Sequence, residues 1–157
     1  MATIEVGKPA PAFSLPASNG KTVSLKDFKG KKRVVLYFYP KDDTPGCTIE
    51  ACGFRDKVLD IEHEGAVVLG VSPDGLTSHN KFIEKFNLPF SLLSDETKKT
   101  CKDYDVWVKK KNYGKEYMGV ARKTFIIGKD GTIQKIYDPV KPEGHQDEVL
   151  TFLKESA

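Results

Sequence analysis

The chain has 157 residues, of which 39% are hydrophobic and 30% charged. This length fits one domain, residues 1–157, whose core needs no disulfide cross-links. Its 25 basic and 22 acidic residues give a net charge of +3, which is too small to require a polyanionic partner. No apolar run is long enough to cross a bilayer, and the first residues lack the pattern of a secretory signal. We therefore expect a cytoplasmic protein without a membrane or nucleic-acid partner.

The first half of the chain predicts a hairpin followed by a β-α-β unit. A turn signal at residues 18–21 separates two short apolar stretches, which predicts a β-hairpin ending near Leu25. Residues 34–39 are apolar on both faces, which is typical of a central strand covered on each side. A helical pattern follows over residues 45–64, and a second buried strand over residues 66–71.

The second half of the chain predicts, in order, a helix over 77–87, a strand around 92–93, a helix over 95–104, strands over 124–127 and 132–137, and a helix over 145–155. A turn signal at 128–131 makes the last two strands an antiparallel hairpin. The lysines at 109–111 are expected to lie in a solvated loop. This order of elements predicts an α/β fold, with a mixed central sheet and helices on both faces.

The residues that carry chemistry lie between positions 40 and 52. They follow the predicted central strand, and open α/β sheets bind their ligands at the carboxyl ends of strands. Thr44 is a candidate N-cap and Pro45 a candidate first helical residue, so Cys47 falls in the first helical turn. Unpaired N–H groups and the helix dipole favour a thiolate there.

A thiolate that attacks a peroxide needs donors for the negative charge that grows on the departing oxygen. The Thr44 hydroxyl and the backbone N–H groups of the helix start are candidates. Arg122, with its five fixed donors, is the best candidate for a cation that holds thiolate and peroxide together. Glu50 is interpreted as a residue that interacts with the helix dipole rather than as an acid or base.

Metal and cofactor sites are not predicted. The three histidines are scattered along the chain, and none has a metal-ligand spacing with a cysteine pair. They stand at positions 63, 79 and 145. The three cysteines, an odd number, are a poor basis for a disulfide framework.

Residues 40–47 resemble the Pro-x-x-x-Thr-x-x-Cys signature of peroxiredoxins, which Pro40, Thr44 and Cys47 match. The continuation to Asp56 is similar to the bacterioferritin-comigratory-protein (PrxQ) subfamily. The likeness covers most of the chain, with further matching stretches at residues 7–13, 37–40, 70–72, 88–90, 92–96 and 122–125.

The resemblance implies a thioredoxin-like fold and thiol-dependent reduction of hydrogen peroxide and organic hydroperoxides. It implies Cys47 as the peroxidatic nucleophile, Pro40 as its shield, and Thr44 and Arg122 as its activating pair. It also implies recycling by thioredoxin or a glutaredoxin-like dithiol donor, and a monomer.

Two cysteines are candidates to resolve an oxidised Cys47. On an ideal helix the Cα atoms of Cys47 and Cys52 would be about 8.6 Å apart, beyond the ~6.8 Å that a disulfide spans. A bond between them therefore requires the first helical turns to unwind. Gly53 lowers the resistance to unwinding by about 1 kcal/mol relative to alanine. Cys101 is the rival resolver, but we interpret it as a buried, inert thiol.

Two other functions remain open at this point. A thiol–disulfide oxidoreductase acting on proteins usually has a Cys-x-x-Cys motif, whereas four residues separate Cys47 from Cys52. A non-catalytic binding module would use the basic stretch 98–123, which holds nine basic and three acidic residues.

Overall fold

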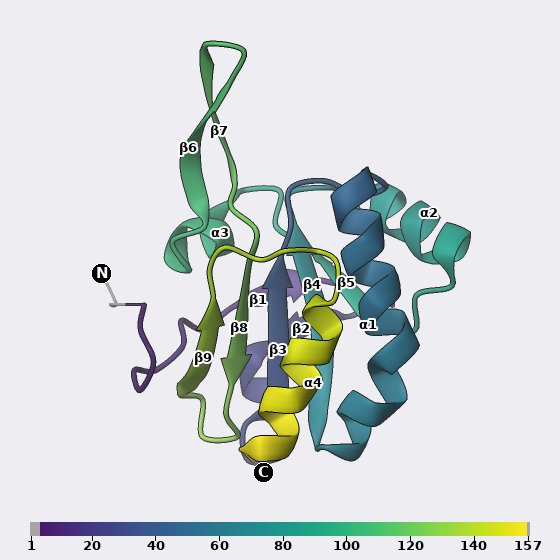
Figure 1. The fold of residues 1–157 in the computed structure, drawn as a ribbon, viewed down its shortest axis with the longest axis vertical. Helices are drawn as coiled ribbons and strands as arrows, with labels where there is room; N and C mark the ends of the chain where they lie inside the picture. The colour runs from purple at the N-terminus through teal and green to yellow at the C-terminus, as the bar shows by residue number, and fades with distance from the viewer. Residues whose placement is uncertain (1–3, 157) are drawn as a thin grey trace.

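The fold of residues 4–156 is described by a computed structural model (Figure 1). A five-stranded sheet in the order β5-β4-β3-β8-β9 lies at its centre. Strand β3 is parallel to β4 and antiparallel to β8, so the sheet is mixed, as predicted. Its strands are β3 (Arg33–Phe38), β4 (Ala66–Ser72), β5 (Ser91–Ser94), β8 (Lys123–Ile127) and β9 (Ile133–Tyr137).

Alternation along β3 divides the interior into two cores, because successive side chains of a strand point to opposite faces. Val35 and Tyr37 belong to the core beneath helices α1 (Pro45–His63), α2 (Leu76–Phe86) and α4 (His145–Glu155). Leu36 and Phe38 belong to the core on the opposite face. That second core is closed by the small sheet of β1 (Ser14–Pro16) and β2 (Thr22–Ser24), the short helix η1 (Leu25–Phe28), and α3 (Lys99–Asp103).

The predicted N-terminal hairpin is confirmed, since β1 and β2 pair antiparallel. The predicted helix over 95–104 is shorter than expected. Both oxygens of the buried Asp95 side chain accept backbone N–H groups, from Thr100 and Cys101, and Lys98 is left-handed. The helix therefore begins only at Lys99.

The prediction of a loop at residues 109–111 was wrong. These lysines belong to β6 (Trp107–Asn112), which pairs with β7 (Lys115–Val120) in a hairpin that extends beyond the rest of the molecule (Figure 1). Its two-residue turn, Tyr113-Gly114, has positive φ at both positions, which is the geometry that favours a tight hairpin. The ladder forms although most of its side chains are exposed, so burial patterning could not reveal it.

No helix within residues 4–156 combines the length and the apolar character that a bilayer span requires.

Candidate active site

The site lies where β3 ends and α1 begins. The loop between them includes Asp43, whose backbone is left-handed, and leads to Thr44. Thr44 has an extended backbone and is the N-cap of α1, and Pro45 is the first residue of the helix. The predicted N-cap is therefore confirmed as a position, but the Thr44 side chain makes no capping bond. Its hydroxyl donates instead to the carbonyl of Lys41, at 2.9 Å. The hydroxyl proton thus secures the loop, and the Thr44 oxygen keeps its acceptor capacity.

Cys47 and Arg122 are in direct contact, although they are 75 positions apart in the sequence. Arg122 lies between β7 and β8, and its Nη2 donates to Cys47 Sγ at 3.2 Å. Cys47 is buried in the first turn of α1, and the Arg122 side chain is 18% exposed. Burial opposes the charge of Arg122, but Cys47 and Glu50 more than offset this, so the pKa of the guanidinium is raised. The arrangement provides a fixed cation for an anionic sulfur.

Glu50 belongs to the site, which corrects its interpretation as a helix-dipole residue. Its side chain is fully buried, and its Oε1 accepts from Arg122 Nη1 at 2.8 Å. Burial raises the pKa of this carboxyl to about 7, although Arg122 opposes the shift. Among the described residues neither Glu50 Oε2 nor the nearby Tyr37 hydroxyl has a hydrogen-bond partner. The i, i+3 spacing of Cys47 and Glu50, which puts both on one helix face, was the signal that could have found Glu50.

A second cation stands near the sulfur. Lys110 of β6 lies over Gly119, where an added Cβ would be 3.2 Å from Lys110 Cδ. Burial and the charge of Arg122 lower the pKa of Lys110, while Cys47 raises it. The charge of a side chain from the middle of β6 therefore interacts with the site, which sequence reasoning did not anticipate.

The other cysteines differ in their surroundings. Cys52 is half-buried in α1, in the same helix as Cys47, and both are free thiols. Cys101 is buried in the core on the opposite face of the sheet from Cys47. Burial and Asp95 raise the pKa of the Cys101 thiol far above its usual range. Pro40 is half-buried in the loop, two residues after the end of β3.

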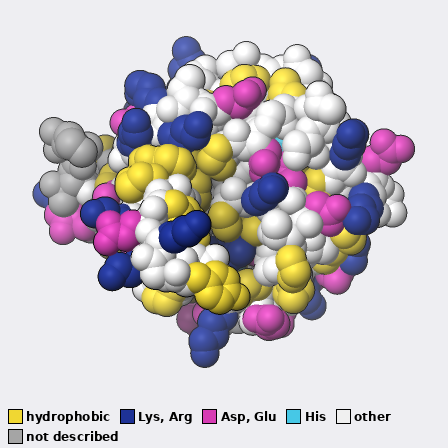
Figure 2. All heavy atoms as spheres, turned by 90° about the horizontal axis from the view of Figure 1, so that it is seen from above, with side chains coloured by type: hydrophobic (Ala, Val, Ile, Leu, Met, Phe, Trp, Pro, Cys, Tyr) yellow, Lys and Arg dark blue, Asp and Glu magenta, His cyan; other side chains and the backbone are white. Residues whose placement is uncertain are grey.

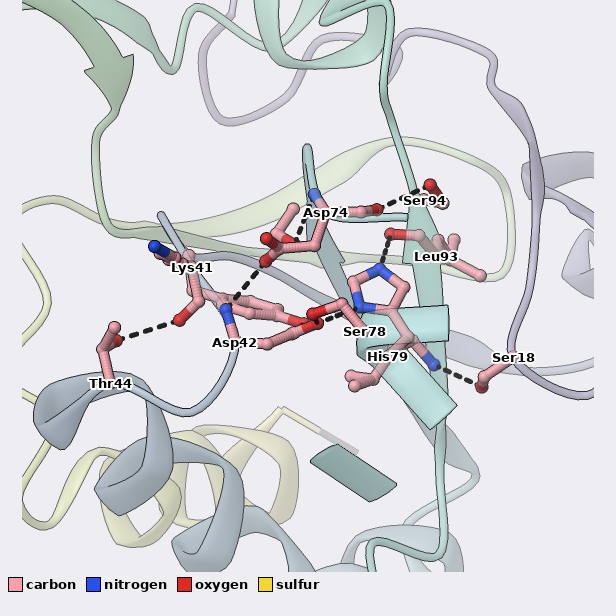
Figure 3. Close-up of polar contacts among 12 residues, drawn as sticks. Ser18, Lys41, Asp42, Thr44, Asp74, Ser78, His79, Leu93 and Ser94 are labelled. Atoms are coloured by element: carbon pink, nitrogen blue, oxygen red, sulfur yellow. Dashed lines mark hydrogen bonds and ion pairs between the residues drawn. The ribbon is translucent and has the colours of Figure 1, made fainter. Parts of the chain in front are cut away.

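A cluster of polar side chains joins the loop to its surroundings and is formed by Asp42, Asp74 and His79 (Figure 3). Within the described chain it is the group whose donor atoms are near enough to one another, within 4.8 Å, to suggest a metal. Both ring nitrogens of His79 already have protein partners, Asp42 and the Leu93 carbonyl. Hydrogen bonds thus account for this cluster.

The basic stretch 98–123 does not form a continuous positive surface. Lys99 pairs with Asp103, and Lys109 with Glu116. Figure 2, which looks onto the end of the molecule where the hairpin rises, shows Lys and Arg side chains interspersed with acidic and hydrophobic ones. A nucleic-acid surface needs clustered basic residues, so this face does not support a binding module.

Comparison with known proteins identifies the family and the fold. Residues 6–136 match the model of the AhpC/TSA family. The chain belongs to this family, the peroxiredoxins. The putative peroxiredoxin Bcp of Coxiella burnetii is 52% identical over 148 residues, which are 94% of this chain and 97% of that protein. The peroxiredoxin Bcp of Bacillus subtilis is also 52% identical, over 98% of this chain and 97% of its own length.

A solved structure of the bacterioferritin comigratory protein of Xanthomonas campestris, described for its alkyl peroxide reduction activity, superposes with a TM-score of 0.89. It is 36% identical to this peroxiredoxin and covers 99% of each chain. The thioredoxin-like fold and the assignment to the Bcp/PrxQ peroxiredoxins are thereby confirmed. The peroxiredoxin is a thiol-dependent peroxidase.

Proposed function

We propose that Cys47 is the peroxidatic nucleophile of this peroxiredoxin. Its thiolate attacks one peroxide oxygen, the O–O bond breaks, and the departing oxygen takes up a proton. A hydroperoxide ROOH thus becomes ROH, and Cys47 becomes a sulfenic acid. The contact of 3.2 Å between Arg122 Nη2 and Cys47 Sγ carries this proposal, because it puts a permanent cation on a sulfur in the first turn of α1.

Arg122 is proposed to stabilise the transition state as well as the thiolate. Its guanidinium has five N–H donors. One on Nη1 donates to Glu50, and one on Nη2 donates to Cys47. Because Glu50 is buried behind it, the guanidinium plane is held in one orientation. A donor that is fixed before the reaction needs no reorganisation as charge develops on the leaving oxygen. Thr44, with its free acceptor capacity, would orient the peroxide proton, and Pro40 would exclude water.

Cys52 is proposed to resolve the sulfenic acid. The Cys52 thiol attacks Cys47 sulfur, water leaves, and an intramolecular disulfide forms. Two observations favour Cys52 over Cys101: Cys101 lies on the opposite face of the sheet, and its raised pKa leaves it a poor nucleophile. With both cysteines in the intact helix α1, the first turns must unwind before the bond can form.

The substrates and partners follow from this cycle. We propose hydrogen peroxide and organic hydroperoxides as substrates, by analogy with the alkyl peroxide reduction described for the Xanthomonas protein. A dithiol protein such as thioredoxin or a glutaredoxin-like donor would reduce the disulfide and restore both thiols. The cycle depends on a reducing compartment, so the cytoplasm is the proposed location, and a monomer is the proposed working form.

Rapid mixing of the reduced enzyme with hydrogen peroxide tests these roles. Cys47→Ser should abolish fast thiol loss. Cys52→Ser should keep the first oxidation but accumulate sulfenic acid. Excess peroxide should then oxidise this sulfenic acid to sulfinic acid more readily than in wild type. Arg122→Ala should slow the first oxidation by about tenfold or more.

Mass mapping of the oxidised wild type should find a disulfide between Cys47 and Cys52. A disulfide between Cys47 and Cys101 would overturn the choice of resolver, and rapid oxidation of Cys47→Ser would overturn the choice of nucleophile.

A further inference from the structure

His79 of α2 is a fully buried histidine that the peroxidase chemistry does not use, and it contacts the loop that leads to the site (Figure 3). Its Nε2 lies 2.9 Å from the carbonyl oxygen of Leu93, which can only accept, so Nε2 carries a hydrogen. Its Nδ1 lies 2.7 Å from Asp42 Oδ2. One proton is therefore shared across this second contact, and the buried pair is electrically neutral as a unit.

Asp42 is the centre of the network. Besides His79, its carboxylate accepts hydrogen bonds from the hydroxyls of Tyr39 and Ser78. Its backbone N–H donates to Asp74 Oδ2 at 2.7 Å, and that carboxylate is itself held by the Ser72 hydroxyl at 2.8 Å. The side chain and the backbone of Asp42 are thus both fixed by groups outside the loop.

The elements joined in this way are far apart in the sequence. Tyr39 follows β3, Ser72 ends β4, Ser78 and His79 belong to α2, and the Leu93 carbonyl belongs to β5. We call Asp42, Asp74, Ser78 and His79 the loop anchor. It fastens the middle of the loop to the rigid sheet and to α2, two residues before the N-cap Thr44 and five before Cys47.

The chain between the anchor and the sulfur has little freedom. The Thr44 hydroxyl donates to the backbone carbonyl of Lys41, the residue before Asp42. The Thr48 N–H donates to the Thr44 carbonyl at 2.8 Å. Displacement of Asp42 would therefore be passed through Thr44 to the first turn of α1, which holds Cys47 against Arg122. A shift of a few tenths of an ångström there is enough to weaken a contact of 3.2 Å.

We propose that His79 is a positioning residue that, through Asp42, holds the first turn of α1 in the folded, peroxide-reactive form. The inference rests on the proposed function of Cys47 and Cys52. It adds an opposition between two steps, because the same anchor that favours the first oxidation resists the unwinding needed for the disulfide. Weakening the anchor should slow the first step and speed the second.

A matched pair of substitutions isolates the contact. In His79→Asn the side-chain amide can replace Nδ1 and donate to Asp42, while the Leu93 carbonyl loses its donor. In His79→Gln the amide can replace Nε2 and donate to Leu93, while Asp42 loses its donor. Each variant thus gives up one buried hydrogen bond, so the two should lose similar stability.

The anchor predicts different kinetics for the two variants. We expect His79→Gln to slow the first oxidation about tenfold and to form the disulfide several-fold faster from sulfenic acid, with less sulfinic acid at high peroxide. His79→Asn should stay within about threefold of wild type in each step. Ser78→Ala, a milder loss at Asp42, should shift both steps in the same directions as His79→Gln by about twofold to threefold.

Amide hydrogen exchange of the reduced protein provides a readout that does not depend on which cysteine resolves. Residues 44–52 should exchange about tenfold faster in His79→Gln than in His79→Asn. Equal exchange and equal oxidation rates in the two variants would overturn the positioning role. If exchange differs as expected but the disulfide rate does not, the positioning role stands and the proposed opposition between the two steps fails.

Discussion

Gly46 lies directly against the guanidinium of Arg122: a Cβ atom at position 46 would be 3.1 Å from Nη2. The same Nη2 donates to Cys47 Sγ at 3.2 Å. The absence of a side chain at position 46 therefore lets Arg122 reach across the first turn of α1 to the sulfur. The Pro-Gly-Cys order at residues 45–47 combines a helix start, room for the cation and the nucleophile.

Gly46→Ala should slow the first oxidation several-fold, because the guanidinium must move by a few tenths of an ångström. The check is a double-mutant cycle of rapid-mixing rates with Arg122→Ala. If the glycine acts through Arg122, Gly46→Ala should have no further effect in the Arg122→Ala background. Additive losses would show that position 46 matters for another reason, such as access of the peroxide.

Glu50→Gln should stabilise the protein at alkaline pH. The pKa of this carboxyl is about 7 in the folded protein and 4.5 in its ordinary state, so the folded chain binds more protons between these values. The Glu50 contribution to the free energy of unfolding must then fall as pH rises from about 4.5 to about 7. The gain of the variant at pH 8 should be on the order of 3 kcal/mol at most, and it should vanish near pH 4.

Urea unfolding of both proteins under reducing conditions, measured across this pH range, is the test. A variant that is less stable than wild type at pH 8 would contradict the expectation. That result would mean that the ion pair with Arg122 contributes more than the burial of Glu50 costs.

Gly53→Ala should destabilise the fold, because a Cβ at this position would collide with the Gln146 side chain of α4. Because the colliding atoms are the amide end of a flexible, half-buried side chain that can move aside, the cost should lie at the low end of the ~1–3 kcal/mol of overpacking. Gly53 therefore serves the close approach of α1 and α4 in addition to the weak helix propensity that the sequence suggested.

The two roles of Gly53 separate in a Gln146→Ala background, where the collision is removed. There Gly53→Ala should add about 1 kcal/mol of helix stability and slow formation of the disulfide between Cys47 and Cys52 about fivefold. The measurement is the rate of conversion of sulfenic acid to disulfide. An unchanged rate would mean that unwinding of α1 does not limit this step.

Cys101 should be inert in the folded enzyme. Its thiol is buried, and its pKa is raised by burial and by Asp95. Timed alkylation with iodoacetamide followed by mass analysis should label Cys101 only after denaturation, and Cys101→Ala should leave both oxidation steps unchanged. Labelling of Cys101 in the folded, reduced enzyme at the rate of Cys52 would contradict this expectation.

Local patterns predicted the parts of the site that lie close together in the chain. The apolar run of β3, the Thr44-Pro45 helix start and the place of Cys47 in the first turn all follow from propensities over a few residues. The last helix was predicted with its observed bounds, and the α/β order with its closing hairpin was also confirmed. Structure that depends on residues a few positions apart can therefore be predicted from a single sequence.

Tertiary structure decided which distant residues meet. The sequence suggested Arg122 as a cation, but only the pairing of β3 with β8 brings it to Cys47. Glu50 is a buried residue of the site because it packs against Arg122. Cys101 is separated from Cys47 because the two lie on opposite faces of the sheet. The contact of Asp42 with His79 likewise depends on how α2 is placed on the sheet. Such contacts depend on strand order and on the faces that helices cover, and neither is encoded within a short window of residues.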